Sequence, residues 1–436
     1  MTLDRRDFLN TFALGLAGGA LSSCASDGAP AEESPLASAR QSAPQGLSAP
    51  QAREAFGEIV RAIDEVSKRY FVPGNIDSVR DLLDGQKFLL QMVEAAITIY
   101  SESDPLRPEF RPLITPYREF GGALNPDADY AFAVIDTSRR YRIRGRKGEE
   151  VYFSYTFHHG EADDVGWHNP VVAARNRFEI EYEADGSYVL TLGPEPAGDR
   201  PNHVQLPTGY ATLVTRHYFE LDPSFHDRED LAVVVEIEAV DDPGPVRPMD
   251  EGEAIRRYGA VARFIRQVGE GLESWEGKAL PDYLSTVPNV PASPGWWTDE
   301  TQEGGGWGAV DNLYMGGFYA LGPDEALVVR GRWPDAVFGN VSVWNRYMQP
   351  YDHRDWPISL NRKQTRLEPD GSFVIVLAHA RPPQPNWLAT EGRSSGLLYW
   401  RYQLTRERPI LPTYEVVPFA DLADLADLAD PAGLAS

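Results

Sequence analysis

The sequence predicts a mainly β protein with a few helices, built from two antiparallel, jelly-roll-like β-sandwich units. Three observations support this fold class. Short runs rich in β-branched and aromatic residues recur from about residue 130 onward, Gly, Pro and Asp turns separate them, and helical periodicity is confined to three stretches. After the N-terminal segment nearly four hundred residues remain, which is more than one hydrophobic core usually serves, so two β units are expected.

The N-terminal segment is predicted to be an export signal, not part of the fold. Arg5 and Arg6 precede a short apolar run rich in Ala, Gly and Leu, which is typical of a twin-arginine signal. The sequence Leu-Ser-Ser-Cys that ends at Cys24 resembles a bacterial lipoprotein box. We therefore expect Cys24 to be lipidated and to become the first mature residue. Signal cleavage just after it, without a lipid, is the alternative.

Apolar residues at helical spacing predict helices over residues 52–70, 78–100 and 251–275, with Ser78 as the cap of the second. Strands are expected at 130–136, 151–157, 177–182, 188–192, 211–218 and 231–238, and again at 313–321, 326–332, 341–348, 373–379 and 396–405. The predicted organisation is a signal (1–24), a disordered tether (25–50), a helical pair with the first sandwich (51–248), a connecting helix with a Pro-rich linker (249–295), the second sandwich (296–418) and a low-complexity tail (419–436).

Charge and cysteine content exclude several classes of function. The chain has 41 basic and 65 acidic residues, a net charge of −24, which repels phosphate backbones and anionic headgroups. We therefore expect no nucleic acid partner and no membrane contact except through the lipid. Cys24 is the only cysteine, so the mature fold has no disulfide, thiolate nucleophile or cysteine-ligated metal. No cofactor is predicted, and the oligomeric state stays open.

Two motifs resemble known families. The run from Gly122 to Tyr130, with Asn125 and Asp127, resembles the Asn-x-Asp-Thr-x-Tyr signature of the bacterial domain of unknown function numbered twelve fifty-four, with Ala128 where Thr is customary. Near the C-terminus, Asn386-Trp387-Leu388, Gly392-Arg393 and Leu397 to Arg401 resemble its usual companion, the domain numbered twelve fourteen. The resemblance implies paired jelly-roll-like domains and frequent export, and leaves the chemistry open.

Acidic and histidine residues provide the candidate catalytic groups. Asp127 and Asp129 open a strand and are candidates for a general acid and base on a glycosidic bond; holding the turn is the alternative. His158 follows as a third catalytic candidate. No metal is predicted, because no recognised ligand spacing appears; the weak candidate ligands, in a loop that is otherwise interpreted as a solvated acidic one, are His158, His159, Asp163 and His168.

Ligand-binding candidates lie mainly in the C-terminal half. Alternation along strand 396–405 places Tyr399 and Arg401 on one face, opposite the bulky side chains of Trp400 and Tyr402. An arginine fork there suits a carboxylate or sulfate, with an ordinary ion pair as the alternative. Tryptophans beside glycines favour a pocket or a loop anchor. The full candidate set is Asn125, Tyr130, Trp307, Asp311, Asn312, Trp387, Arg393, Tyr399 and Arg401.

These observations predict an exported cell-envelope protein that binds a small organic ligand, a glycan fragment or an apolar metabolite, in an aromatic-lined cleft. Whether it is an enzyme stays open; a cofactor-free hydrolase or lyase is the expected class if it is one. The first alternative is a non-catalytic envelope interaction or assembly lipoprotein, which would expose an apolar patch. The second is a metal-dependent enzyme with histidine and carboxylate ligands.

Overall fold

The computed structural model describes residues 49–114, 125–160, 169–275, 280–296 and 308–425. Its helices are α3 (Pro50–Tyr70), α4 (Val79–Ala96) with the π-helical turn η2 (Ile97–Ser101), α5 (Glu251–Gly269) with the 3-10 turn η4 (Glu270–Leu272), η3 (Phe225–Asp227), η6 (Phe419–Asp421) and α6 (Leu422–Leu425). The predicted signal, Cys24 and all but the last two residues of the predicted tether lie outside the described residues. None of the described helices is both long enough and apolar enough to cross a membrane.

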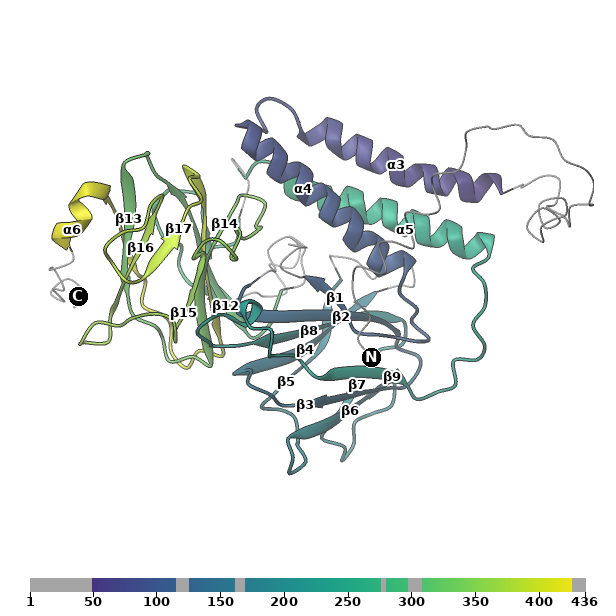
Figure 1. Ribbon diagram of the computed structural model, residues 1–436. Coiled ribbons are helices and arrows are strands. Elements are labelled where there is room, and N and C mark those ends of the chain that lie inside the picture. The colour runs from purple at the N-terminus through teal and green to yellow at the C-terminus, as the bar shows by residue number, and fades with distance from the viewer. Residues whose placement is uncertain (1–48, 115–124, 161–168, 276–279, 297–307, 426–436) are drawn as a thin grey trace, which may run out of the picture. The chain divides into compact units, whose positions relative to one another are not determined.

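The three long helices agree with the predicted ranges and pack together (Figure 1). The Ser78 hydroxyl accepts a hydrogen bond from the Asp81 amide at 3.1 Å, as the capping pattern predicts. Asp250 caps α5 in the same way, through the Glu253 amide at 2.8 Å. A Cβ at Gly269 would lie 2.7 Å from a methyl group of Val66, so the glycine lets α5 approach α3 closely.

The first β part consists of two packed sheets. One has the order β1-β2-β8-β4-β5 and the other β7-β6-β3-β9. Their strands are β1 (Arg111–Ile114), β2 (Ala128–Asp136), β3 (Tyr141–Arg146), β4 (Tyr152–Gly160), β5 (Val171–Asn176), β6 (Ser187–Gly193), β7 (His203–Gln205), β8 (Tyr210–Tyr218) and β9 (Val235–Ala239). Ile135, Ile143, Phe157 and Leu190 belong to the core between them.

The second β part repeats this architecture. A sheet of order β10-β12-β18-β14-β15, with β11 beside β12, packs on one of order β17-β16-β13-β19. The strands are β10 (Leu284–Ser285), β11 (Gly295–Trp296), β12 (Asn312–Ala320), β13 (Glu325–Gly331), β14 (Phe338–Trp344), β15 (Ser359–Asn361), β16 (Phe373–Ala378), β17 (Trp387–Ala389), β18 (Ser395–Gln403) and β19 (Thr413–Pro418). Trp400, Leu398 and Ile375 fill the core between its sheets. The protein is therefore mainly β, with four sheets, as the sequence predicts.

Two details differ from the prediction. The expected strand at 177–182 does not form, because Asn176 starts a turn there: its side-chain oxygen accepts from the Phe178 amide and its carbonyl from the Glu179 amide, both at 3.0 Å. The strand lies just before it, at Val171–Asn176. In addition, three short strands pair in parallel, namely β7 with β6, β10 with β12 and β17 with β16.

Ion pairs join the helices to the second β part within the compact unit of residues 50–436. Arg346 binds Asp81 of α4 at 2.7 Å, and Arg393 binds Asp84 of the same helix. Between the two β parts, Arg362 holds the carboxylate of Glu220 with two nitrogens. The predicted division into separate sandwich domains stays a prediction.

Candidate functional site

One side of sheet β12-β18-β14 is polar although it is buried. Alternate residues of β18 point to this side, and the strand register places their partners beside them: Tyr314 and Asn340 lie opposite Arg401, and Asn312 and Phe338 lie opposite Gln403. All six are buried, and Asn312, Phe338, Asn340 and Gln403 are completely inaccessible. The other side of the same strands carries the apolar core of the second β part.

The facing side of sheet β2-β8-β4 carries buried polar side chains as well. They come from alternate positions of the three strands and are Tyr130, Thr212, Arg216, Tyr218, Tyr152, Ser154, Thr156 and His158, each at most 4% exposed. Phe132, Val134 and Val214 lie on the same side and belong to the apolar core that includes the helices. We call these polar side chains, together with the side chains on the polar side of β12-β18-β14, the junction layer. It contains two buried arginines, one from each β part.

Direct contacts show that the two sides of the junction layer meet. The Tyr152 hydroxyl donates to the Asp311 carboxylate, and Asn176 of β5 donates to the same oxygen at 3.5 Å. Arg216 donates to the Gly308 carbonyl at 3.3 Å and to the Thr156 hydroxyl at 2.9 Å. The Tyr218 and Phe338 rings lie 5.0 Å apart.

The two arginines act on the same tyrosine pair. The rings of Tyr130 and Tyr218 lie 6.1 Å apart, edge to face. Burial raises the pKa of both hydroxyls, most strongly that of Tyr130. The positive charges of Arg216 and Arg401 oppose this rise at both tyrosines. The charges of both guanidinium groups therefore influence the same two hydroxyls in the junction layer.

Aromatic rings surround Arg401. Its guanidinium lies 4.6 Å from the ring centre of Trp344 and 5.2 Å from that of Tyr399. These two rings stack at 4.4 Å with an interplanar angle of 17°. Because a guanidinium stacks well on aromatic faces, the rings fix the plane of the arginine fork. The Trp344 ring therefore belongs to the junction layer as well.

Asp127 lies at the edge of the layer and is completely buried. Its carboxylate accepts four hydrogen bonds, from Ser224 (2.9 Å), Asn340 (3.0 Å), Asn361 (2.8 Å) and Ser359 (3.3 Å). Burial nevertheless raises its pKa to about 6, against the effect of these donors. Asn125 joins the network by accepting from the Asp127 amide and from Asn340. The two β parts are therefore bound together through one carboxylate.

The other predicted catalytic residues do not gather around Asp127. Asp129 pairs with His217 in the strand register and lies on the side of β2 that faces away from the junction layer; burial raises its pKa. His158 is in the layer, where burial and the charge of Arg216 lower its pKa to about 3. Its neighbour His159 is on the opposite side of β4, near the Thr208 carbonyl. The described residues thus show no carboxylate pair of the glycosidase kind.

Two predicted ligand residues lie outside the layer. Trp387 is in β17, where it packs against the apolar cluster that includes Val376 and Val417 and donates to the Ala378 carbonyl at 3.3 Å. Arg393 is held by Asp84 and stacks over Tyr351 at 4.7 Å. For Arg393 the ordinary ion pair was therefore the better interpretation.

Several candidates lie outside the described residues, namely Trp307, Asp163 and His168. Among the residues that are described, no group of three or more His, Cys, Asp or Glu side chains lies close enough together to hold a metal ion.

The sequence analysis missed Arg216, Asn340 and Gln403. The alternation of residues along β8 could have identified Arg216, because it places Arg216 on the same face as Thr212 and Tyr218. For Asn340 no local pattern exists, since its importance comes from Asp127 in the other β part.

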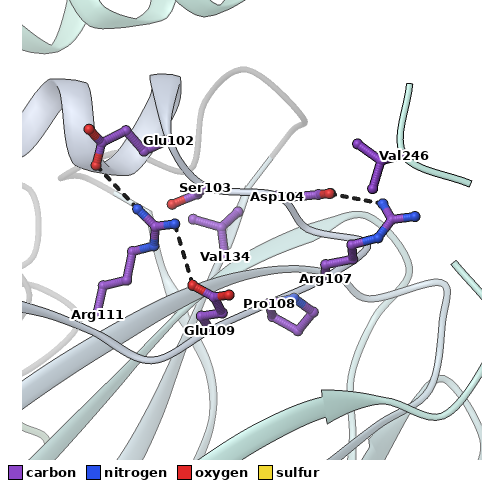
Figure 2. Close-up of a pocket in the computed structure, with 9 residues that line it drawn as sticks. All are labelled: Glu102, Ser103, Asp104, Arg107, Pro108, Glu109, Arg111, Val134 and Val246. Atoms are coloured by element: carbon purple, nitrogen blue, oxygen red, sulfur yellow. Dashed lines mark hydrogen bonds and ion pairs between the residues drawn. The ribbon is translucent and has the colours of Figure 1, made fainter. Parts of the chain in front are cut away.

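A surface pocket of about 240 Å³ lies elsewhere, between η2 and β1 (Figure 2). Its charges are already paired: Arg111 binds Glu102 at 3.2 Å and Glu109 at 3.4 Å, and Arg107 binds Asp104 at 3.1 Å. A charged ligand would have to compete with these contacts, so this pocket is a poorer candidate than the junction layer.

Fold and site together define a β-rich protein whose two β parts meet across a buried layer of polar and aromatic side chains. The chain carries a DUF1214 domain, described as a protein of unknown function, in two segments, residues 123–220 and 328–407. The first segment contains β2, β4 and β8, and the second contains β14 and β18. Most of the junction layer therefore comes from these two segments, while Asn312 and Tyr314 of β12 lie between them in the sequence. The motif at Asn125, which we compared with the domain numbered twelve fifty-four, falls within a DUF1214 segment.

The chain is similar to two solved structures of bacterial proteins. A crystal structure of an uncharacterised protein from Burkholderia cenocepacia has a TM-score of 0.71 and 23% identity, covering 86% of this chain and 100% of that one. The VPA0106 protein from Vibrio parahaemolyticus gives a TM-score of 0.45 at 13% identity, covering 77% of this chain and 98% of that one. No curated protein matches the chain. The Burkholderia structure supports the fold alone.

Proposed function

We propose that the protein binds a small organic ligand, neutral to anionic, in the junction layer. One observation supports this most directly: two fully buried amides in the layer, Asn312 and Gln403, have no hydrogen-bond partner among the described residues. Buried polar groups are normally paired, because each unpaired group costs about 1 to 3 kcal/mol. A ligand that supplies the missing partners would remove this cost.

A hydrolase or lyase activity in the same layer would need a carboxylate that can transfer a proton, and Asp127 and Asp311 are the two to compare. Asp127 accepts four hydrogen bonds and contacts both β parts, which suits a positioning role better than proton transfer. The Asp311 carboxylate accepts hydrogen bonds from only two side chains of the described structure, Tyr152 and Asn176. Any general base would therefore be sought at Asp311.

We expect the purified protein to be stabilised against heat by at least one member of a panel of sugars, sugar acids and aromatic carboxylates. Arg401→Met should abolish that stabilisation, because the variant keeps the packing on Trp344 and removes the fork. The measurement is the melting temperature with and without each compound. Arg332→Met, at an exposed ion pair with Asp370, is the matched control. A shift that persists in Arg401→Met would place the binding site elsewhere.

An assembly role is the second candidate, favoured by an apolar stripe on α4. Val79, Leu83 and Leu90 are 75%, 58% and 66% exposed, and Ile97 of η2 continues the stripe one heptad further. An exposed stripe of this kind suits a second helix. If no compound in the panel binds and Leu83→Glu converts an oligomer into a monomer in light scattering, this candidate replaces the first.

We also propose export through the twin-arginine pathway and lipid attachment at Cys24, in a periplasmic or outer-envelope location. Replacing Arg5 and Arg6 with lysine should leave the protein in the cytoplasm, because the pathway recognises the arginine pair. Cys24→Ala should move exported protein from the membrane fraction to the soluble fraction. Cell fractionation and the mass of the mature N-terminus measure both; export unaffected by the lysine pair would contradict the proposal.

The resemblance of the Asn125 region to the domain numbered twelve fifty-four is retained as a proposal. The order Asn125, Asp127, Tyr130 at the start of β2 supports it. An alignment of close relatives in which these three positions vary freely would contradict it.

A further inference from the structure

The outer side of α4 carries residue spacing that is typical of a coiled coil. Residues recur there at alternating intervals of four and three positions, from the first residue of α4 to the first residue of η2; they are Val79, Leu83, Gln86, Leu90, Val93 and Ile97. Five of the six are apolar, and Gln86 is the polar one. We call this set the α4 seam. Such intervals keep side chains on one stripe of a helix and define the a and d positions at which two helices pair.

The α4 seam lies opposite the side by which the helix is held in the fold. Phe88, Met92 and Ala95 are buried in the core that α4 shares with α5. Leu83 and Leu90 of the seam are instead 58% and 66% exposed. The fold itself therefore forms and fixes the helix, so a partner does not have to induce it. A second helix can pack on the seam while the contacts that hold α4 stay in place.

The seam is complementary to itself in the antiparallel direction. In one register of two antiparallel copies, the residues that meet are Val79 with Ile97, Leu83 with Val93, and Gln86 with Leu90, and each pair occurs twice. A two-fold axis requires this reciprocity, because each contact between two copies is repeated with the roles exchanged. All six residues of the seam are used, and only the layers that contain Gln86 are partly polar.

Charges beside the seam favour the same direction. Arg80 and Glu94 lie on one edge of it, at e positions, and in the antiparallel register Arg80 of each copy comes beside Glu94 of the other. Arg80 also binds Glu391 of its own chain at 3.2 Å and keeps half of its side chain exposed. Lys87 meets its counterpart at the axis, which gives one repulsive contact against two attractive ones. A parallel pair would bring Glu94 beside Leu89, because e positions then face g positions.

We propose that the protein forms a two-fold symmetric dimer by antiparallel packing of the α4 seam on a second copy of this chain. This inference rests on the assembly role proposed above and deepens it by naming the partner and the register. It is independent of ligand binding in the junction layer. The seam is about 27 Å long, so the contact is at the small end of stable interfaces, and we expect the dimer to form at micromolar concentrations.

Cysteine cross-linking tests the direction of the pairing. Leu83→Cys and Val93→Cys are prepared as separate full-length proteins in a Cys24→Ala background, which removes the only native thiol. We expect a mixture of the two proteins to form a disulfide-linked dimer under mild oxidation, because these positions meet in the antiparallel register. Neither protein alone should do so, since two copies of position 83 are then about 15 Å apart along the helices, too far for a disulfide. A parallel pair would cross-link each protein with itself.

Two further variants should change the dimer affinity in opposite directions, as measured by analytical ultracentrifugation. Gln86→Leu makes the seam fully apolar and should tighten the dimer about tenfold or more. Leu83→Glu should abolish dimerisation, because it places a charge opposite Val93 in a contact that excludes water. Val60→Glu is the matched control: Val60 of α3 is 59% exposed, close to the value for Leu83, and this variant should leave the dimer intact.

The outcomes that would overturn the inference differ from failure of the assembly role itself. Cross-linking of each single-cysteine protein with itself, and none specific to the mixture, would contradict the antiparallel register and leave assembly through α4 standing. Dissociation by Val60→Glu and not by Leu83→Glu would move the contact to α3. If the protein stays monomeric and Leu83→Glu weakens its binding to neutral lipid vesicles, a membrane covers the seam and the dimer is wrong. A monomer at every concentration that binds no vesicles would contradict both the dimer and the assembly role.

Discussion

Asp127→Ala is expected to lower the free energy of unfolding by about 3 kcal/mol or more. The carboxylate is fully buried and is the common acceptor of four donors. Removing it leaves the Ser224 and Ser359 hydroxyls and the Asn340 and Asn361 amides short of an acceptor. Each buried donor that loses its partner costs about 1 to 3 kcal/mol. Urea denaturation monitored by tryptophan fluorescence measures the change.

The position of these donors makes the prediction specific. Asn340, Ser359 and Asn361 belong to the second β part, so the variant should also weaken the attachment of the two β parts. Limited proteolysis should then cut between them faster than in the wild type. Asp185→Ala is a suitable control. The Asp185 carboxylate also accepts hydrogen bonds, from the amide and the hydroxyl of Ser187, but it lies at the surface. Equal losses for the two variants would contradict a special role for Asp127.

We expect stability to fall steeply between pH 6.5 and pH 4 because of buried histidines. Burial lowers the pKa of His158 and of His217 to about 3, and burial together with neighbouring His353 lowers that of His226 to about 4. In the unfolded chain these groups take up protons near pH 6.5. As pH drops below that value, the unfolded state gains protons that the folded state does not, so folding becomes less favourable.

The sign and size follow from this linkage. Each histidine makes the free energy of unfolding depend on pH, with a slope of up to about 1.4 kcal/mol per pH unit. Its contribution to stability is complete above pH 6.5 and is lost as the pH falls toward the folded pKa of the histidine. Asp127, Asp129 and Glu150 oppose the trend, because burial raises the pKa of each carboxyl above its ordinary value and so favours the folded state at lower pH. The pKa falls to about 3 or 4 at three histidines, whereas among these carboxyls it reaches about 6 at Asp127 alone, so the net effect is loss of stability on acidification.

His217→Phe tests the prediction directly. The histidine ring stacks on Phe153 at 5.3 Å, so phenylalanine should fit while removing the titrating group. Unfolding free energies at pH 7 and pH 5 should differ less in this variant than in the wild type. Phe153→Leu, which alters the packing but no titrating group, should lower stability by similar amounts at both pH values. An unchanged difference in His217→Phe would show that other groups control the acid response.

Local patterns in the sequence carry much of the architecture. Helical spacing of apolar residues locates α3, α4 and α5, because a helix repeats every 3.6 residues whatever surrounds it. Alternation along β18 places Tyr399 and Arg401 on one side and Trp400 on the other, for the same local reason. The prediction of a strand at 177–182 was wrong. The aromatic and β-branched residues of this run suit a strand, but the Asn176 side chain starts a turn there.

The candidate site is harder to predict from the sequence than the fold, because it depends on contacts between segments that are distant in the chain. Trp387 and Arg393 looked equal to Arg401 as ligand residues, yet they contact β17 neighbours and α4, respectively. Their positions follow from strand order, and no period in the sequence specifies which strands become neighbours.

By itself, then, the sequence determined where the three long helices and most of the strands form and which side of β18 is polar, because those properties arise from interactions within a few residues. Only the tertiary structure decided that this polar side is covered by β2, β8 and β4, that Arg216 joins Arg401 there, and that Asp127 receives donors from the far β part. The physical reason is that pairing and burial depend on segments that meet only when the whole chain folds, with Asn361 reaching Asp127 across 234 residues.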